Sequence, residues 1–160
     1  EAHFGMIRPG ILLYGGSPSP ELRPSIPLEP AMTLKAKVIQ VRDFPEGAAV
    51  SYGRTYTTAS PERIAVISAG YSDGLPRALS NRGQVLIRGE RAPIRGRVCM
   101  NLTMADVSRL PEVRPGDEAV FLGRQEGAVL TGDEVAAACG TISYEIYCTV
   151  GRCGEKTTIP

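Results

Sequence analysis

The sequence contains no tryptophan, a single histidine (His3) and only three lysines among its 18 basic residues. Because 17 acidic residues bring the formal net charge to +1, the chain lacks the basic surplus that nucleic acids and anionic membranes attract. No apolar run approaches the roughly 20 residues needed to cross a bilayer. The first residues also lack the basic start and apolar core of a signal peptide. These absences predict a cytoplasmic protein without nucleic-acid or membrane partners.

A metal site is equally disfavoured by what is missing. The four cysteines form no CxxC pair, and His3 has no second histidine with which to complete a zinc-binding pattern. We therefore predict that no metal is bound and that the thiols are reduced, as is usual in the cytosol.

The distribution of proline divides the chain. Five prolines with polar spacers lie within Ser17–Pro30, which predicts an extended linker over residues 17–30. Residues 1–16 then read as the tail end of a preceding domain, and residues 31–160 as the main domain. Because the chain opens with Glu1 rather than methionine, we expect it to be a piece of a longer polypeptide.

The main domain is predicted to be mainly β, a β-barrel or sandwich, because short apolar runs alternate with glycine and proline. The predicted strands are Met32–Val41, Ala48–Val50, Ile64–Ala69, Gln84–Ile87, Ala92–Val98, Met104–Val107, Glu118–Leu122 and Ile142–Val150. One short helix is predicted between Thr131 and Gly140. Thr131 and Glu134 have the spacing of a capping box, and Gly140 is a typical C-terminal stop.

A polar turn follows the predicted strand Ile64–Ala69. Its sequence, Gly70-Tyr71-Ser72-Asp73-Gly74, places three polar side chains between two glycines. On spacing alone this is an ordinary turn, although turns delivered by a rigid strand are also where functional groups are usually presented.

A second turn, Arg8-Pro9-Gly10-Ile11, interrupts an apolar segment near the start of the chain. The consecutive N–H groups of Gly10 and Ile11 would suit a phosphate, and an exposed turn with a solvated arginine is the plainer interpretation. Three further segments, Ser51-Tyr52-Gly53, Gly96–Asn101 and Thr141–Glu145, read on their own as packing segments of a β domain.

Taken in order, these five motifs resemble those of the alanine racemases, enzymes that use pyridoxal phosphate (PLP). The resemblance covers nearly the whole chain and implies the C-terminal β-domain of such an enzyme, preceded by the last residues of its (β/α)8 barrel. It implies that Arg8 hydrogen-bonds the pyridine nitrogen of PLP. The amides of Gly10 and Ile11 and the hydroxyl of Tyr144 would hold the cofactor phosphate.

The same resemblance implies that Tyr71 is the catalytic acid/base on one face of the substrate and that the backbone N–H of Met100 binds the substrate carboxylate. Both would reach the active site of the partner subunit in a homodimer with shared sites. Asn101 stands where the family usually has aspartate, and Tyr52 is assigned no catalytic role.

The implied activity is interconversion of L-alanine and D-alanine through a PLP aldimine with one base on each face. The family's cofactor lysine lies in the barrel, and Lys35, Lys37 and Lys156 do not match its surroundings. The fragment alone is therefore expected to be inactive. Three alternatives stay open: a racemase of serine or broader specificity, a PLP-dependent amino-acid decarboxylase of the same architecture, and a non-catalytic dimerisation domain.

Overall fold

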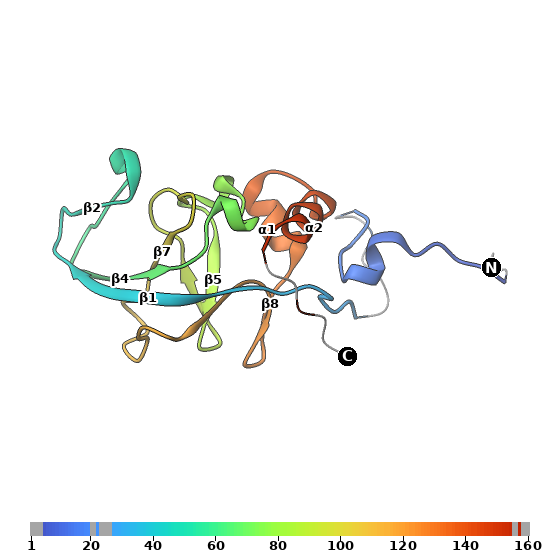
Figure 1. Cartoon of the computed structure of the whole chain (residues 1–160), viewed down its shortest axis with the longest axis horizontal. Coiled ribbons are helices and arrows are strands. Elements are labelled where there is room, and N and C mark those ends of the chain that lie inside the picture. Colours follow the sequence, from blue (N-terminus) through green and yellow to red (C-terminus); the bar gives the residue numbers. More distant parts are fainter. Residues whose placement is uncertain (1–4, 20–21, 23–26, 155–156, 158–160) are drawn as a thin grey trace.

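The computed structural model describes residues 5–19, 22, 27–154 and 157. Part of the predicted linker and Lys156 lie outside these ranges, and the division into residues 1–16, 17–30 and 31–160 stays a prediction. The domain that dominates Figure 1 is built on one seven-stranded sheet with the order β6-β5-β8-β1-β4-β7 and with β9 paired to β8. Its strands are β1 (Leu34–Phe44), β4 (Glu62–Ile67), β5 (Gln84–Ile87), β6 (Glu90–Pro93), β7 (Thr103–Asp106), β8 (Glu118–Gln125) and β9 (Ala128–Leu130).

The two edges of this sheet meet, so that it closes into a barrel. Directly after β6, Ile94 forms an antiparallel bridge with Ala105 of β7, and the N–H of Arg95 donates to the carbonyl of Met104 at 2.9 Å. Closure removes exposed strand edges, which otherwise invite association with other chains. The prediction of a mainly β fold is confirmed.

The long strand β1 connects the two halves of the barrel. Its first residues pair with β8, and Val38–Phe44 pair with β4, with register shifts at Leu34/Lys35 and Val38/Gln40. Such bulges raise the local twist and bend a strand, which lets one strand serve both halves. The core inside consists of fully buried aliphatic and aromatic side chains, among them Ile67, Leu86 and Phe121.

A small finger projects from the barrel between β1 and β4. It consists of β2 (Ala49–Val50) and β3 (Tyr56–Thr57), which pair with each other, and the short 3-10 turn η2 (Tyr52–Arg54) at its end. Figure 1 shows the finger beyond the end of the barrel that lies farthest from the chain's N-terminus.

The predicted helix is present, and a second helix was missed. Helix α1 (Gly132–Cys139) begins after Thr131, which forms the predicted capping box with Glu134, and it ends at Gly140. The prediction of a strand over Ile142–Val150 is wrong: this segment forms α2 (Ser143–Arg152). The buried residues of α2 recur at helical spacing and are Ser143, Ile146, Tyr147 and Val150.

Most of the other strand predictions hold, with shifted bounds. Gln84–Ile87 matches β5 at both ends. The strand predicted over Ala92–Val98 is wrong in most of its length, because β6 ends at Pro93 and only the bridge at Ile94 continues the pairing. The short strands β3 and β9 were not predicted, because two or three residues are too few to show the alternation of apolar and polar side chains that indicates a strand.

Candidate active site

The turn with Tyr71 forms the 3-10 segment η3 (Tyr71–Asp73), which begins a few residues after the end of β4. It lies against the backbone of Cys99 and Met100, and the contact is so close that only glycine fits at position 70. A Cβ atom there would come within 2.2 Å of the Cys99 carbonyl oxygen and 2.3 Å of the Met100 carbonyl oxygen. Close approach of one backbone to another is a standard reason for glycine.

Backbone hydrogen bonds hold this turn in place. The N–H of Tyr71 donates to the carbonyl of Cys99 at 3.0 Å, and the N–H of Ser72 donates to the carbonyl of Met100 at 2.9 Å. The carboxylate of Asp73 accepts from the N–H of Gly70 at 2.9 Å. The structure thus brings the predicted residues Tyr71 and Met100 together, with side chains that are 44% and 56% exposed.

The finger carries a second tyrosine, Tyr52, on an unusual backbone. Ser51 and Arg54, on either side, have φ angles of 65° and 48°. Positive φ costs a non-glycine residue about 1–3 kcal/mol and is found preferentially at functional sites. Tyr52 is 74% exposed, the most exposed of the aromatic side chains among the exposed hydrophobic residues.

The Tyr52 turn and the Tyr71 turn share one support. The hydroxyl of Ser51 donates to the carbonyl of Arg97 at 2.7 Å and lies 3.4 Å from the thiol of Cys99. At Gly53, which also has positive φ, a Cβ would lie 3.2 Å from the Arg97 guanidinium. Residues 97–100 therefore support both tyrosines at the same end of the barrel.

Tyr52 is the candidate that interpretation of the sequence passed over. The sequence feature that could have indicated Tyr52 is Ser-Tyr-Gly, in which Gly53 adopts the positive φ of the turn after the aromatic residue. The neighbouring Tyr56 has a different character. Its hydroxyl donates to Glu62 at 2.7 Å, and its ring lies 4.7 Å below the Arg95 guanidinium. Burial and the hydrogen bond to Glu62 raise the pKa of Tyr56 to about 12, so this phenol gives up its proton less readily than an ordinary tyrosine and its contacts are structural.

A second group of predicted residues lies around η1 (Gly10–Tyr14). Arg8 and Gly10 are exposed, and the side chain of Ile11 is buried in the core. Within the described ranges, no acceptor takes up the N–H groups of Gly10 and Ile11, which are the first amides of η1. Ile11 therefore anchors the turn, and the two amides have no hydrogen-bond acceptor among the described residues.

Several contacts tie η1 to the helices. The rings of Tyr14 and Tyr147 lie 6.1 Å apart, and the N–H of Ser17 donates to the Asp133 carboxylate at 3.0 Å. Tyr144 belongs to α2, the helix that also carries Tyr147, and is 44% exposed. The structure thus places η1 against the helix that carries Tyr144.

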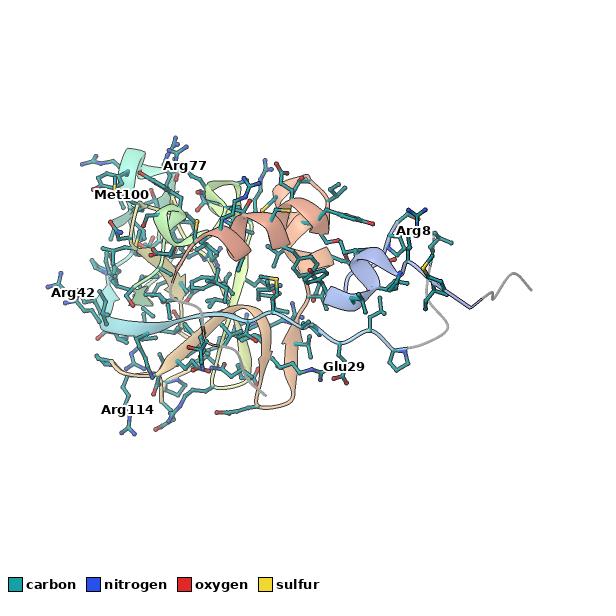
Figure 2. All side chains as sticks on the ribbon, turned by 45° about the vertical axis from the view of Figure 1, so that its right-hand side comes forward. Arg8, Glu29, Arg42, Arg77, Met100 and Arg114 are labelled. Atoms are coloured by element: carbon teal, nitrogen blue, oxygen red, sulfur yellow. The ribbon has the colours of Figure 1, made fainter. Side chains whose placement is uncertain are left out.

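The two groups of predicted residues are far apart. Figure 2 shows Arg8 at one end of the molecule and Met100 with Arg77 at the other. One copy of the chain therefore does not bring Arg8 and Met100 to a single site. In the part of the chain that the structure describes, no cluster of three histidine, cysteine or acidic side chains could hold a metal ion. No described helix combines the length and the apolar character of a membrane span.

The profile of the family described as "Alanine racemase, C-terminal domain" matches residues 31–157. The chain belongs to this family. Its sequence is 54% identical over 152 residues to an alanine racemase of Syntrophobacter fumaroxidans, covering 95% of this chain and 40% of that protein. With an alanine racemase of Desulfosudis oleivorans it shares 51% identity over 151 residues, covering 94% and 39%.

Solved structures of alanine racemases have the same fold as this chain. The enzyme from the D-cycloserine producer Streptomyces lavendulae matches with a TM-score of 0.80 and 42% identity, over 90% of this chain and 38% of that one. The Bacillus anthracis enzyme with bound L-Ala-P matches with a TM-score of 0.78 and 42% identity, over 88% and 36%. This chain therefore spans about two fifths of the length of the alanine racemases that it matches.

Proposed function

We propose that this chain is the C-terminal part of an alanine racemase that interconverts L-alanine and D-alanine with PLP. The observation that carries the proposal is the shared support of residues 97–100, which presents two exposed tyrosines and the Met100 N–H at one end of the barrel. Membership of the alanine racemase family supports the substrate and the reaction.

The residues around η1 fit a cofactor with a phosphate group. Arg8, the amides of Gly10 and Ile11 and the hydroxyl of Tyr144 all offer hydrogen-bond donors, and no acidic side chain is among them. Two adjacent N–H groups without an acceptor in the described chain suit a phosphate oxygen. When bound, PLP would supply an electron sink for the charge left when the α-proton departs.

Arg8 would tune that sink through the proton at the pyridine nitrogen. A guanidinium is permanently charged and a poor proton donor. If it bonded the pyridine nitrogen, Arg8 would leave this atom without a proton and would weaken the electron sink. Side reactions that need a stronger sink, such as transamination, would then be limited.

Racemisation requires one group that removes the α-proton and a second, on the opposite face, that returns a proton. The sequence predicts Tyr71 for one face. We propose Tyr52 as a second candidate and prefer it, because Tyr52 is more exposed and lies between two residues with positive φ. Both phenols lie on the support that also carries Met100, whose N–H would bind the substrate carboxylate.

The separation of the two groups supports a homodimer with shared active sites. Arg8, Gly10, Ile11 and Tyr144 would serve the site of their own chain, and the tyrosine and Met100 would serve the partner's site. The four cysteines are all free, which fits a reducing compartment, and we place the enzyme in the cytoplasm.

The decisive experiment compares Tyr52→Phe and Tyr71→Phe in the full-length PLP-bound polypeptide. Each variant keeps the ring and removes the hydroxyl. Loss of an acid/base group lowers the turnover of alanine about 10²–10⁴-fold, and we expect this loss for one of the two, with Tyr52 favoured. Since a base on the other face persists, exchange of the α-proton in one enantiomer should survive. If both variants racemise alanine within twofold of the parent, the assignment of a tyrosine base is wrong.

The isolated 160-residue chain should bind PLP poorly and show no racemase activity. Lys35 of β1 forms an ion pair with Glu118 at 2.9 Å, and the ammonium of Lys37 donates to the Gly116 carbonyl at 3.2 Å. Each of these ammonium groups therefore already has a partner within the chain. D-Alanine production by this chain that disappears when one lysine is mutated would contradict the proposal. A substrate panel of alanine, serine and basic amino acids, with assays for racemisation and CO2 release, separates the racemase from a broader racemase, a decarboxylase and a non-catalytic dimerisation domain.

A further inference from the structure

We propose that Ser72 and Asn101 form a positioning pair that holds the peptide group after Met100, so that Met100 keeps its N–H toward the carboxylate of the substrate, and that the neutral amide of Asn101 sets the affinity for that carboxylate. The inference rests on the proposed function, since it concerns the same site. The supporting observations are the hydrogen bonds between the Tyr71 turn and residues 99–101. The two glycines of the turn do not account for these bonds.

The orientation of the Met100 N–H follows from the planarity of the peptide group. The carbonyl of Cys99 and the N–H of Met100 belong to one trans peptide and point in opposite directions. Because the Cys99 carbonyl accepts the N–H of Tyr71 at 3.0 Å, the Met100 N–H is turned away from the Tyr71 turn. In the described chain no group accepts a hydrogen bond from it, and the Met100 side chain is 56% exposed.

Ser72 fixes the next peptide group with two of its own groups. Its N–H lies 2.9 Å and its hydroxyl 2.8 Å from the carbonyl oxygen of Met100. The amide Nδ2 of Asn101 donates to the same hydroxyl at 2.8 Å. A hydroxyl has one proton to donate and lone pairs that accept. The donor from Asn101 therefore leaves the hydroxyl proton of Ser72 for an acceptor, and the Met100 carbonyl at 2.8 Å is nearer than Asp73 Oδ2 at 3.2 Å.

The charge at position 101 matters because an acid is already close by. Asp73 Oδ2 lies 3.2 Å from the Ser72 hydroxyl and accepts the N–H of Gly70 at 2.9 Å. A carboxylate at position 101 would give the Ser72 hydroxyl a third acceptor and no donor. It would also place a negative charge one residue from the N–H that receives an anionic group. Asn101 avoids both effects, since its amide donates and carries no charge at any pH.

The test uses the full-length PLP enzyme with four variants. Ser72→Ala removes the hydroxyl, and Ser72→Thr restores it. Asn101→Asp adds the charge, and Gln40→Glu is the control, because it adds the same charge at an exposed residue of β1. The measurements are KM and kcat for alanine at low salt and at 1 M salt, and the inhibition constant of propionate, a simple carboxylate.

At low salt, Asn101→Asp should raise KM and the propionate inhibition constant about twofold, because like charges repel weakly across water. The change in kcat should be smaller, and 1 M salt should remove most of the effect. Ser72→Ala should lower kcat/KM about tenfold at both salt concentrations, because it loses hydrogen bonds rather than charge. Ser72→Thr should recover most of this loss, and Gln40→Glu should behave as the parent.

Two results would overturn the inference. The first is an Asn101→Asp variant whose KM and propionate affinity equal those of the parent at low salt. The second is a Ser72→Ala variant with unchanged kcat/KM. If the parent itself does not racemise alanine, the proposed function fails instead. The dissociation constant of propionate, measured by direct binding to the parent and to Asn101→Asp, then still decides whether Asn101 controls carboxylate affinity.

Discussion

The amide nitrogen of Tyr71 lies 3.0 Å from the carbonyl oxygen of Cys99 and donates a hydrogen bond to it. Together with the bonds from Ser72 to the Met100 carbonyl, this contact joins the turn after β4 to the segment before β7, 28 positions further along the chain. It also brings a predicted acid/base residue beside the residue predicted to bind the substrate. The arrangement depends on backbone atoms, so its weak point is the glycine that permits the approach.

Gly70→Ala should therefore damage this end of the barrel. The new Cβ would meet two carbonyl oxygens at 2.2 and 2.3 Å, and these are backbone atoms that cannot turn aside. We expect the free energy of unfolding in urea to fall by about 2–4 kcal/mol. As a control, Gly151→Ala in α2 makes only an ordinary contact with Met32 at 3.7 Å and should raise stability by about 0.5–1 kcal/mol. Equal urea midpoints for the two variants would contradict this interpretation of Gly70.

Tyr147→Phe should be neutral or stabilising. The ring of Tyr147 is buried against η1 and α1, and its hydroxyl lies beside the N–H of Gly132 without a hydrogen bond of normal geometry to any described residue. An unsatisfied buried hydroxyl costs free energy, and its removal leaves the ring packing intact. We expect a gain of up to about 1 kcal/mol in unfolding free energy. Tyr147→Ala, which also removes the ring, should cost about 3–5 kcal/mol. A large loss for the Phe variant would show that the hydroxyl has a partner.

The raised pKa of Tyr56 predicts that the folded protein loses stability at alkaline pH. Burial and the hydrogen bond to Glu62 raise its pKa from 10.0 to about 12 in the folded state. Between these values the unfolded chain has lost the proton and the folded chain retains it, so stability falls as the pH rises from about 10 to about 12. Tyr56→Phe should flatten the dependence of the urea midpoint on pH in this window. Absorbance titration of the folded protein should lose one late-titrating phenol in that variant, and an unchanged titration would count against the assignment.

Glu134 predicts a loss of stability at acidic pH. Burial alone would raise its pKa, but hydrogen bonds from Thr131 and the Arg91 guanidinium, 2.8 Å away, lower it below the ordinary value of 4.5. The stabilisation is therefore complete above about pH 4.5 and is lost as the pH falls through the lower folded-state pKa. Glu134→Gln should show a shallower fall of the urea midpoint between pH 7 and pH 3.

The capping partner provides a separate comparison for Glu134. The hydroxyl of Thr131 accepts the N–H of Glu134 at 3.2 Å, and the Glu134 carboxylate accepts the N–H of Thr131 at 2.9 Å. Thr131→Ala should cost about 1 kcal/mol at pH 7, the usual value for a lost N-cap. Since Thr131 does not titrate, most of this cost should persist at acidic pH. If the stability cost of Thr131→Ala vanished at low pH, the whole effect of the cap would come from the charge of Glu134.

The missed helix shows where a local pattern ceases to be informative. Ile142–Val150 mixes apolar, aromatic and β-branched residues, and a short run of this kind fits a buried strand as well as a helix. Packing decides between them. Ile146, Tyr147 and Val150 fall on one helical face against the rest of the core, and the strand edges of the barrel are already paired without this segment.

The sequence by itself determined the features that depend on neighbours along the chain. These are the mainly β composition, the capping box of α1, the glycine turns and the ordered motifs of the alanine racemase family. The tertiary structure alone decided the features that depend on contacts between distant residues. It closed the barrel through Ile94 and Ala105, put Tyr52 and Tyr71 on one support, and placed Arg8 far from Met100. The physical reason is that turn and cap preferences act within a few residues, whereas the position of an active-site group is set by burial and hydrogen bonds formed across the fold.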